Sequence, residues 1–187
     1  MSVYDSTMKE TKQNMQKSID FLKSQLSKIR TGRASTSLID GVKVDYYGAM
    51  SPISQVATVS TPDARTIMIQ PFDRSTIADI EKAIRQADLG FNPQNDGTVI
   101  RIPVPPLTEE RRKEFVKLCK KYAEDAKVGV RNHRRDAIEV LRKAEKKSEL
   151  TEDDLKMGEE EIQDETNSFV KQIDDMASRK EKELLDQ

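Results

Sequence analysis

Apolar residues in the first 30 positions recur at the spacing of a helix that packs on other helices. They follow one another at steps of three, four and seven: Met8, Met15, Ile19, Leu22, Leu26 and Ile29. This spacing places them on one face of an α-helix. Gly32 follows the last of them and is predicted to end the helix, because glycine readily adopts the left-handed conformation found after a last helical turn.

Between Leu38 and Pro106 the pattern changes to that of short strands. The segments "VKVDY", "QVATVS" and "TIMIQP" alternate or are rich in β-branched residues, and Pro or Gly bounds them. In "FNPQNDGTVIRI", Asp96 and Gly97 lie between strand-like flanks, which predicts a β-hairpin with a tight turn.

One helix is predicted inside this β-rich region, over "DRSTIADIEKAIRQADLG". Asp73 or Ser75 is available as its N-terminal cap, and Gly90 is expected to end it. Its apolar stripe is formed by Ile77, Ile80 and Ile84.

Helical periodicity resumes at Thr108 and continues to about Lys147, a length of roughly 60 Å at a rise of about 1.5 Å per residue. "SELTEDDL" then breaks the pattern. Thr151 followed by Asp154 predicts the cap of a third helix, as a capping box with Asp in place of Glu. The apolar residues of that helix are Leu155, Ile162, Phe169, Ile173, Met176 and Leu184.

These patterns predict an α+β protein of two domains. Residues 1–30 and 106–187 are expected to form an antiparallel three-helix bundle, with residues 31–105 as an inserted small β/α/β domain. The two connections, at about 30–33 and 103–106, would then act as a paired hinge. The second contains "PVPP", which is stiff and continues neither a helix nor a strand.

The composition is that of long exposed helices with narrow apolar faces. Charged residues make up 35% of the chain, as do hydrophobic residues, whereas about 25% charged is usual. Cys119 is the single cysteine, so no intrachain disulfide can form. No signal-peptide pattern and no membrane-spanning apolar run is present. We therefore expect a cytoplasmic protein with no membrane partner.

Positive charge is concentrated although the net charge is −1. Residues 107–147 contain fourteen basic and eight acidic side chains, and residues 148–187 contain five basic and fourteen acidic ones. The stretch "VGVRNHRRDA" carries three arginines and the single histidine. Localised basic charge of this kind indicates a partner with negative charge.

The cations of the second helix fall on one face at 100° per residue. Within about 40° of Arg131 lie Lys113, Lys117, Lys120, Lys127, Arg135 and Arg142, with Arg134 on the flank. The apolar residues Phe115, Cys119, Tyr122, Ala126, Val130, Ala137, Val140 and Leu141 fall on the opposite side and are expected to face the bundle.

A nucleic-acid backbone is the leading candidate partner of this basic face, because arginine forms paired hydrogen bonds with phosphate. Two alternatives remain open. The face is an ordinary solvated helix surface, or the protein is a non-enzymatic helical adaptor whose partner is an acidic protein.

No signature of catalysis is present. Cys119 lies on the apolar face, where a buried thiol is expected, and His133 falls on the core side of its helix. One His and one Cys do not make a zinc site without carboxylates. An enzymatic function would need a site around Asp73, Asp79 or Asp96, which their spacing does not favour. We therefore predict a protein that is not an enzyme and has no cofactor or metal.

Four segments resemble the ribosome recycling factors of bacteria and organelles, and they occur in order along nearly the whole chain: "LSKIRTGRAS", "IQPFDRSTIADIEKAI", "LGFNPQNDGTVIRIPVPPLTEERRKEFVK" and "VRNHRRDA". The resemblance implies an L-shaped monomer with a three-helix bundle and a hinged small domain. It implies a translation factor that binds the post-termination ribosome and, with elongation factor G and GTP, splits it into subunits.

The resemblance also implies the residues that act. Arg131 and Arg134 match the arginines that contact ribosomal RNA of the large subunit. Further basic positions are Arg111, Arg112, Arg30 and Arg33, and the hinge falls on Thr31, Gly32, Val104, Pro105 and Pro106. With Arg135 and Lys127 of the basic face, these arginines form the predicted RNA-binding set. His133 stands where relatives have an apolar residue, which affects its local packing alone.

Overall fold

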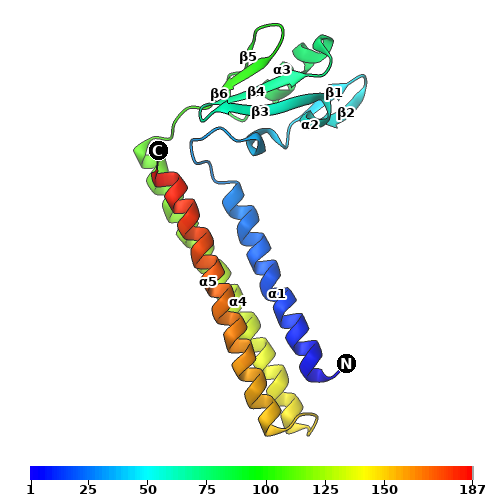
Figure 1. Ribbon diagram of the computed structural model, residues 1–187, viewed down its shortest axis with the longest axis vertical. Coiled ribbons are helices and arrows are strands. Elements are labelled where there is room, and N and C mark those ends of the chain that lie inside the picture. Colours follow the sequence, from blue (N-terminus) through cyan, green and yellow to red (C-terminus); the bar gives the residue numbers. More distant parts are fainter. Residues whose placement is uncertain (187) are drawn as a thin grey trace. The chain divides into compact units, whose positions relative to one another are not determined.

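The computed structural model describes residues 1–186, which form two compact units. One unit comprises Met1–Arg30 and the chain from Glu109 onward, and the other comprises Thr31–Thr108. The predicted combination of a long helical bundle and a small mixed α/β unit is confirmed (Figure 1).

Three long helices make the first unit: α1 (Val3–Ser27), α4 (Glu109–Lys146) and α5 (Glu152–Leu185). Tyr4 and Met8 of α1 lie beside Leu141 near the end of α4 and Gly158 near the start of α5. α1 and α5 therefore run in the same direction and α4 runs against both (Figure 1).

The bundle is stabilised by the narrow apolar faces that the sequence predicts. Met15, Leu22, Leu141 and Ile173 are fully buried. Each such side chain contributes about 1.5–3 kcal/mol when it leaves water. The third helix begins as predicted, because the side chain of Thr151 accepts from the Asp154 N–H and that of Asp154 accepts from the Thr151 N–H.

The predicted end of the first helix is wrong. α1 ends at Ser27, and the Lys28 N–H donates to the carbonyls of Gln25 and Leu26, which tightens the last turn. Gly32 does adopt a left-handed conformation, with φ of 79°, but it lies beyond this closed end. Its conformation therefore belongs to the start of the second unit and does not cap the helix.

The second unit contains an antiparallel sheet of four strands in the order β3-β4-β6-β5, formed by Ala57–Asp63, Thr66–Pro71, Ile100–Pro103 and Gln94–Asn95. A separate hairpin pairs β1 (Lys43–Tyr46) with β2 (Ala49–Pro52). Two 3₁₀ turns, η1 (Thr36–Ile39) and η2 (Arg74–Thr76), and two helices, α2 (Ile53–Val56) and α3 (Ile77–Gln86), complete it.

Sequence patterns located most of these elements. "TIMIQP" is β4, and "FNPQNDGTVIRI" contains the predicted hairpin of β5 and β6. The carboxylate of Asp96 holds its turn by accepting from the N–H groups of Thr98 and Val99. "QVATVS" is corrected: Gln55 and Val56 belong to α2, and β3 starts at Ala57. The hairpin partner β2 was not predicted, because "AMSP" lacks β-branched residues.

The helix predicted over residues 73–90 is shorter at both ends. Asp73 is the cap, but of η2, where its side chain accepts from the Ser75 N–H. α3 ends at Gln86, and Asp88 already has φ of 50°, so Gly90 does not end it. Ile80 and Ile84 of α3 are buried in one apolar core with Ile67 and Ile102 of the sheet.

Candidate nucleic-acid interface

The basic face of α4 lies on the surface of the bundle. Val130 and Leu141 of α4 are buried, whereas Arg131, Arg135, Lys117 and Lys120 are exposed. This separation follows from the helical period, which places the cations and the apolar residues on different sides of a helix 38 residues long. The face thus presents cations along more than one turn of a rigid helix.

These outward cations are only partly neutralised, and the exposed ion pair between Lys113 and Glu109 is one of the pairs that form. Arg131 Nη1 lies 3.6 Å from Glu124 Oε1, and its side chain keeps 51% of its surface exposed. Such an exposed pair contributes at most about 1 kcal/mol, so a phosphate can replace the carboxylate. Lys117 and Lys120 have no ion pair within residues 1–186. Arg135 donates through Nη2 to the amide oxygen of Asn132.

Two further arginines of the face are held by α5. Arg134 Nη1 donates to Gln163 Oε1 at 2.7 Å, and Arg142 Nε donates to Glu159 Oε1 at 2.8 Å. Arg134 is half-buried, and its Nε is buried without a hydrogen-bond partner in the part of the chain that the structure describes. These bonds order both guanidinium groups before any ligand binds.

Two expectations about α4 are wrong. Lys127 was predicted on the outward basic face, but its ammonium pairs with Asp174 of α5 and only 19% of its side chain is exposed. Val140 was predicted to face the bundle, but it is 46% exposed. Lys127 lies at the edge of the predicted basic face and Val140 at the edge of the predicted apolar face. At such an edge, the position of the neighbouring helix decides whether a side chain is covered or exposed.

The other predicted basic residues do not belong to this face of α4. Arg111 and Arg112 are in the first turn of α4, where Arg111 Nη1 approaches Glu114 Oε2 at 3.3 Å. Arg112 is half-buried, with its Nε enclosed. Arg30 and Arg33 are exposed in the chain that follows α1. The structure thus groups Arg131, Arg134 and Arg135, and it separates them along the chain from the other four.

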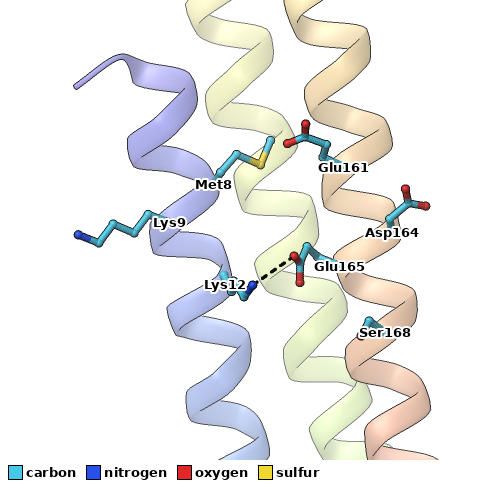
Figure 2. A pocket seen from close by; sticks show the side chains of 7 residues that line it. All are labelled: Met8, Lys9, Lys12, Glu161, Asp164, Glu165 and Ser168. Carbon is cyan, nitrogen blue, oxygen red and sulfur yellow. Dashed lines mark ion pairs between the residues drawn. The ribbon is translucent and has the colours of Figure 1, made fainter.

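The opposite charge lies in a groove between α1 and α5. Figure 2 shows the carboxylates of Glu161, Asp164 and Glu165 on α5, with Lys12 of α1 directed at Glu165. Lys12 Nζ lies 3.6 Å from Glu165 Oε1, whereas Lys9 points away (Figure 2). The bundle is therefore polarised, with cations along α4 and carboxylates between α1 and α5.

The surroundings of Cys119 and His133, the two residues of α4 considered for catalysis or metal binding, are those of structural side chains. Burial raises the pKa of the Cys119 thiol to about 11, which opposes a nucleophilic role at neutral pH. His133 is half-buried and lines a small cavity with Glu10 and Asp136. No group of three or more His, Cys, Asp or Glu placed to hold a metal ion occurs in residues 1–186.

The three aspartates of the small unit are used in turns and caps. The carboxylate of Asp73 accepts from the Tyr47 hydroxyl as well as from Ser75. Asp96 Oδ2 accepts from Arg101 Nη1 at 2.7 Å. Asp79 is an exposed residue in the first turn of α3, where a negative charge suits the helix dipole.

Comparison with known proteins decides the family. The sequence model described as "Ribosome recycling factor" matches residues 22–185. The chain belongs to the ribosome recycling factor family. It is 54% identical over 182 residues to the ribosome-recycling factor of Oleidesulfovibrio alaskensis, covering 97% of this chain and 99% of the relative. It is 52% identical over 179 residues to that of Bacillus licheniformis, covering 96% and 97%.

Solved structures agree with this assignment. A solution structure of the ribosome recycling factor matches with a TM-score of 0.81 and 40% identity, over 100% of both chains. A second match contains models of the T. thermophilus ribosome recycling factor and the E. coli elongation factor G bound to the E. coli post-termination complex. Its TM-score is 0.65 and its sequence identity 45%, over 99% of this chain and 100% of that one. No helix within residues 1–186 is long and apolar enough to span a membrane.

Proposed function

We propose that this protein binds the post-termination ribosome and, with elongation factor G and GTP, splits it into subunits. The observation that carries the proposal is the cationic face of α4, where Arg131 and Arg135 are exposed beside Lys117 and Lys120. A row of exposed cations on a rigid helix suits the regularly spaced phosphates of ribosomal RNA.

The RNA-binding set consists of seven arginines with unequal roles. Arg131, Arg134 and Arg135 form the central contact, and the outer positions are Arg111, Arg112, Arg30 and Arg33. Lys127 does not belong to the set, because its ammonium is occupied by Asp174. The partner surface is the RNA of the large ribosomal subunit.

The hinge comprises Thr31 and Gly32 on one connection and Val104, Pro105 and Pro106 on the other. Within the small unit, the Ala34 N–H donates to the Ala64 carbonyl and the Val104 N–H donates to the Arg65 carbonyl. Both connections are thus attached to the same turn between β3 and β4. Attachment at neighbouring points favours rotation about one axis, and the prolines make the second connection stiff enough to transmit force.

The protein acts without catalytic residues or a cofactor of its own, as a monomer in the cytoplasm. GTP hydrolysis by elongation factor G supplies the work, and the bundle holds its position on RNA while the small unit is moved. An acidic protein partner is the rival explanation of the basic face. The cluster of arginines with its adjoining lysines favours RNA as the partner. The affinity of RNA for such a face falls steeply as the salt concentration rises.

Light scattering of post-termination ribosomes tests the proposal. We expect splitting only when this protein, elongation factor G and GTP are all present, and none with a GTP analogue that cannot be hydrolysed. Splitting that is independent of this protein would refute the proposal.

A double variant, Pro105→Gly with Pro106→Gly, tests the hinge. It should bind ribosomes normally and split them slowly, and splitting at the wild-type rate would exclude a stiff hinge.

A further inference from the structure

A depression of about 430 Å³ lies on α4 within the basic face. It is lined by Arg134, Arg135, Ile138, Glu139 and Arg142. Its volume falls within the range of about 300–1,000 Å³ that is typical of small-ligand sites. A hollow of this size between arginines can hold a single phosphate or a flat ring, so its other lining residues decide between the two.

Each of the three arginines around the depression forms a hydrogen bond with a neighbouring side chain. Arg134 and Arg142 are bonded to Gln163 and Glu159 of α5, and Arg135 is bonded to Asn132 of its own helix. Long side chains normally lose conformational entropy when they bind a ligand, and ordering them beforehand reduces that cost. Their planar guanidinium groups can stack on a flat aromatic ring.

Two residues of the depression favour a base over a phosphate. Ile138 contributes an apolar surface, which gives a phosphate no hydrogen bond but packs well against a flat ring. Glu139 contributes a carboxylate, which repels phosphate and accepts hydrogen bonds from the amino groups of bases. The hydrogen bond from Lys143 lowers the pKa of Glu139, so the carboxylate stays ionised.

We propose that this depression binds one unpaired RNA base, which packs on Ile138 between the guanidinium groups and donates an amino hydrogen bond to Glu139. This inference rests on the proposed function and specifies its ligand: RNA with a base outside the helical stack. Lys143 Nζ contacts Glu139 Oε1 at 2.7 Å, which leaves Oε2 as the acceptor. Adenine, guanine and cytosine carry an amino group and fit, whereas uracil does not.

Binding to three short RNA hairpins tests the inference. One hairpin is fully paired, one has a single bulged adenine and one has a bulged uracil. We expect the full chain to bind the adenine bulge at least about fivefold more tightly than the paired hairpin, the lower end of what stacking one base contributes. The uracil bulge should fall between them. A 2-aminopurine in the bulge should change its fluorescence on binding.

Variants separate this site from the general RNA contact. Ile138→Ala should abolish the preference for the adenine bulge and leave the affinity for the paired hairpin unchanged. Glu139→Ala should also abolish the preference, but it should raise the affinity for all three hairpins, because it removes a carboxylate that repels phosphate. Val128→Ala is the matched control, because Val128 is an exposed apolar residue of α4 outside the depression. Circular dichroism should show unchanged helicity in all three.

Equal affinity of the wild type for all three hairpins would overturn the inference, as would a bulge preference that survives both variants. Failure of the proposed function has a different signature. In that case the protein fails to split ribosomes with elongation factor G and GTP, whichever hairpin it prefers.

Discussion

Gly158 of α5 lies so close to Leu141 of α4 that a Cβ atom at position 158 would be 2.6 Å from Leu141 Cδ1. The same atom would lie 3.0 Å from Cε2 of Tyr4. Three helices therefore meet at a point where only a hydrogen atom fits. Leu141 is fully buried, so a shift of its methyl group would disturb the side chains packed around it.

Gly158→Ala should destabilise the bundle by about 1–3 kcal/mol, because overpacking outweighs the better helix propensity of alanine. Gly129→Ala is the matched control: its Cβ would meet only Ser18 Oγ, at 3.5 Å. That change should be neutral or stabilise by up to about 1 kcal/mol. Urea unfolding followed by circular dichroism measures both, and equal effects of the two substitutions would contradict the packing argument.

Arg131→Ala and Arg135→Ala should each weaken binding to the large ribosomal subunit without loss of helicity. Each removes a phosphate contact, so the slope of log affinity against log salt should become shallower by roughly 0.7–0.9. Lys9→Ala removes an exposed charge outside the face and should change little. Wild-type affinity in both arginine variants at moderate salt would exclude the α4 face as the RNA contact.

Asp96 makes the stability of the small unit depend on pH. Hydrogen bonds from the N–H groups of Val99 and Thr98, then that of Arg101, lower the pKa of Asp96 to about 2. In the unfolded chain its pKa is about 3.9, so the ionised carboxylate stabilises the fold above about pH 4. That contribution is lost as the pH falls toward 2.

Urea unfolding of the wild type and Asp96→Asn at a series of pH values checks this. The difference in free energy of unfolding should be constant above pH 5 and should shrink between pH 4 and pH 2. A difference that does not change with pH would show that the carboxylate charge is not what holds the turn.

Cys119 should be unreactive in the folded protein. It is fully buried, and burial raises its pKa to about 11, so on the order of a thousandth of the thiol is ionised at pH 8. A chromogenic disulfide reagent should label it rapidly in denaturant and very slowly without it. Rapid stoichiometric labelling of the folded protein would show that the bundle opens around α4.

Local sequence determined the elements whose signals are short in range. Thr151 and Asp154 form a cap because each side chain reaches a backbone N–H three residues away, and Asp96 with Gly97 turns the β5–β6 hairpin by bonds within a few residues. The long helical periods of α4 and α5 likewise placed buried residues such as Leu141 and Ile173 on the correct side. These features need no knowledge of what packs against them.

Tertiary structure decided which cations remain available and where glycine is required. Lys127 and Arg135 are both basic residues of one predicted face, yet only Lys127 meets a carboxylate of α5, because Asp174 lies beside it. Gly158 gives no sequence signal, since its need arises from Tyr4 and Leu141, which are distant in the chain. Helical periodicity assigns a direction to each side chain, but the charge and volume that it encounters there belong to a neighbouring helix.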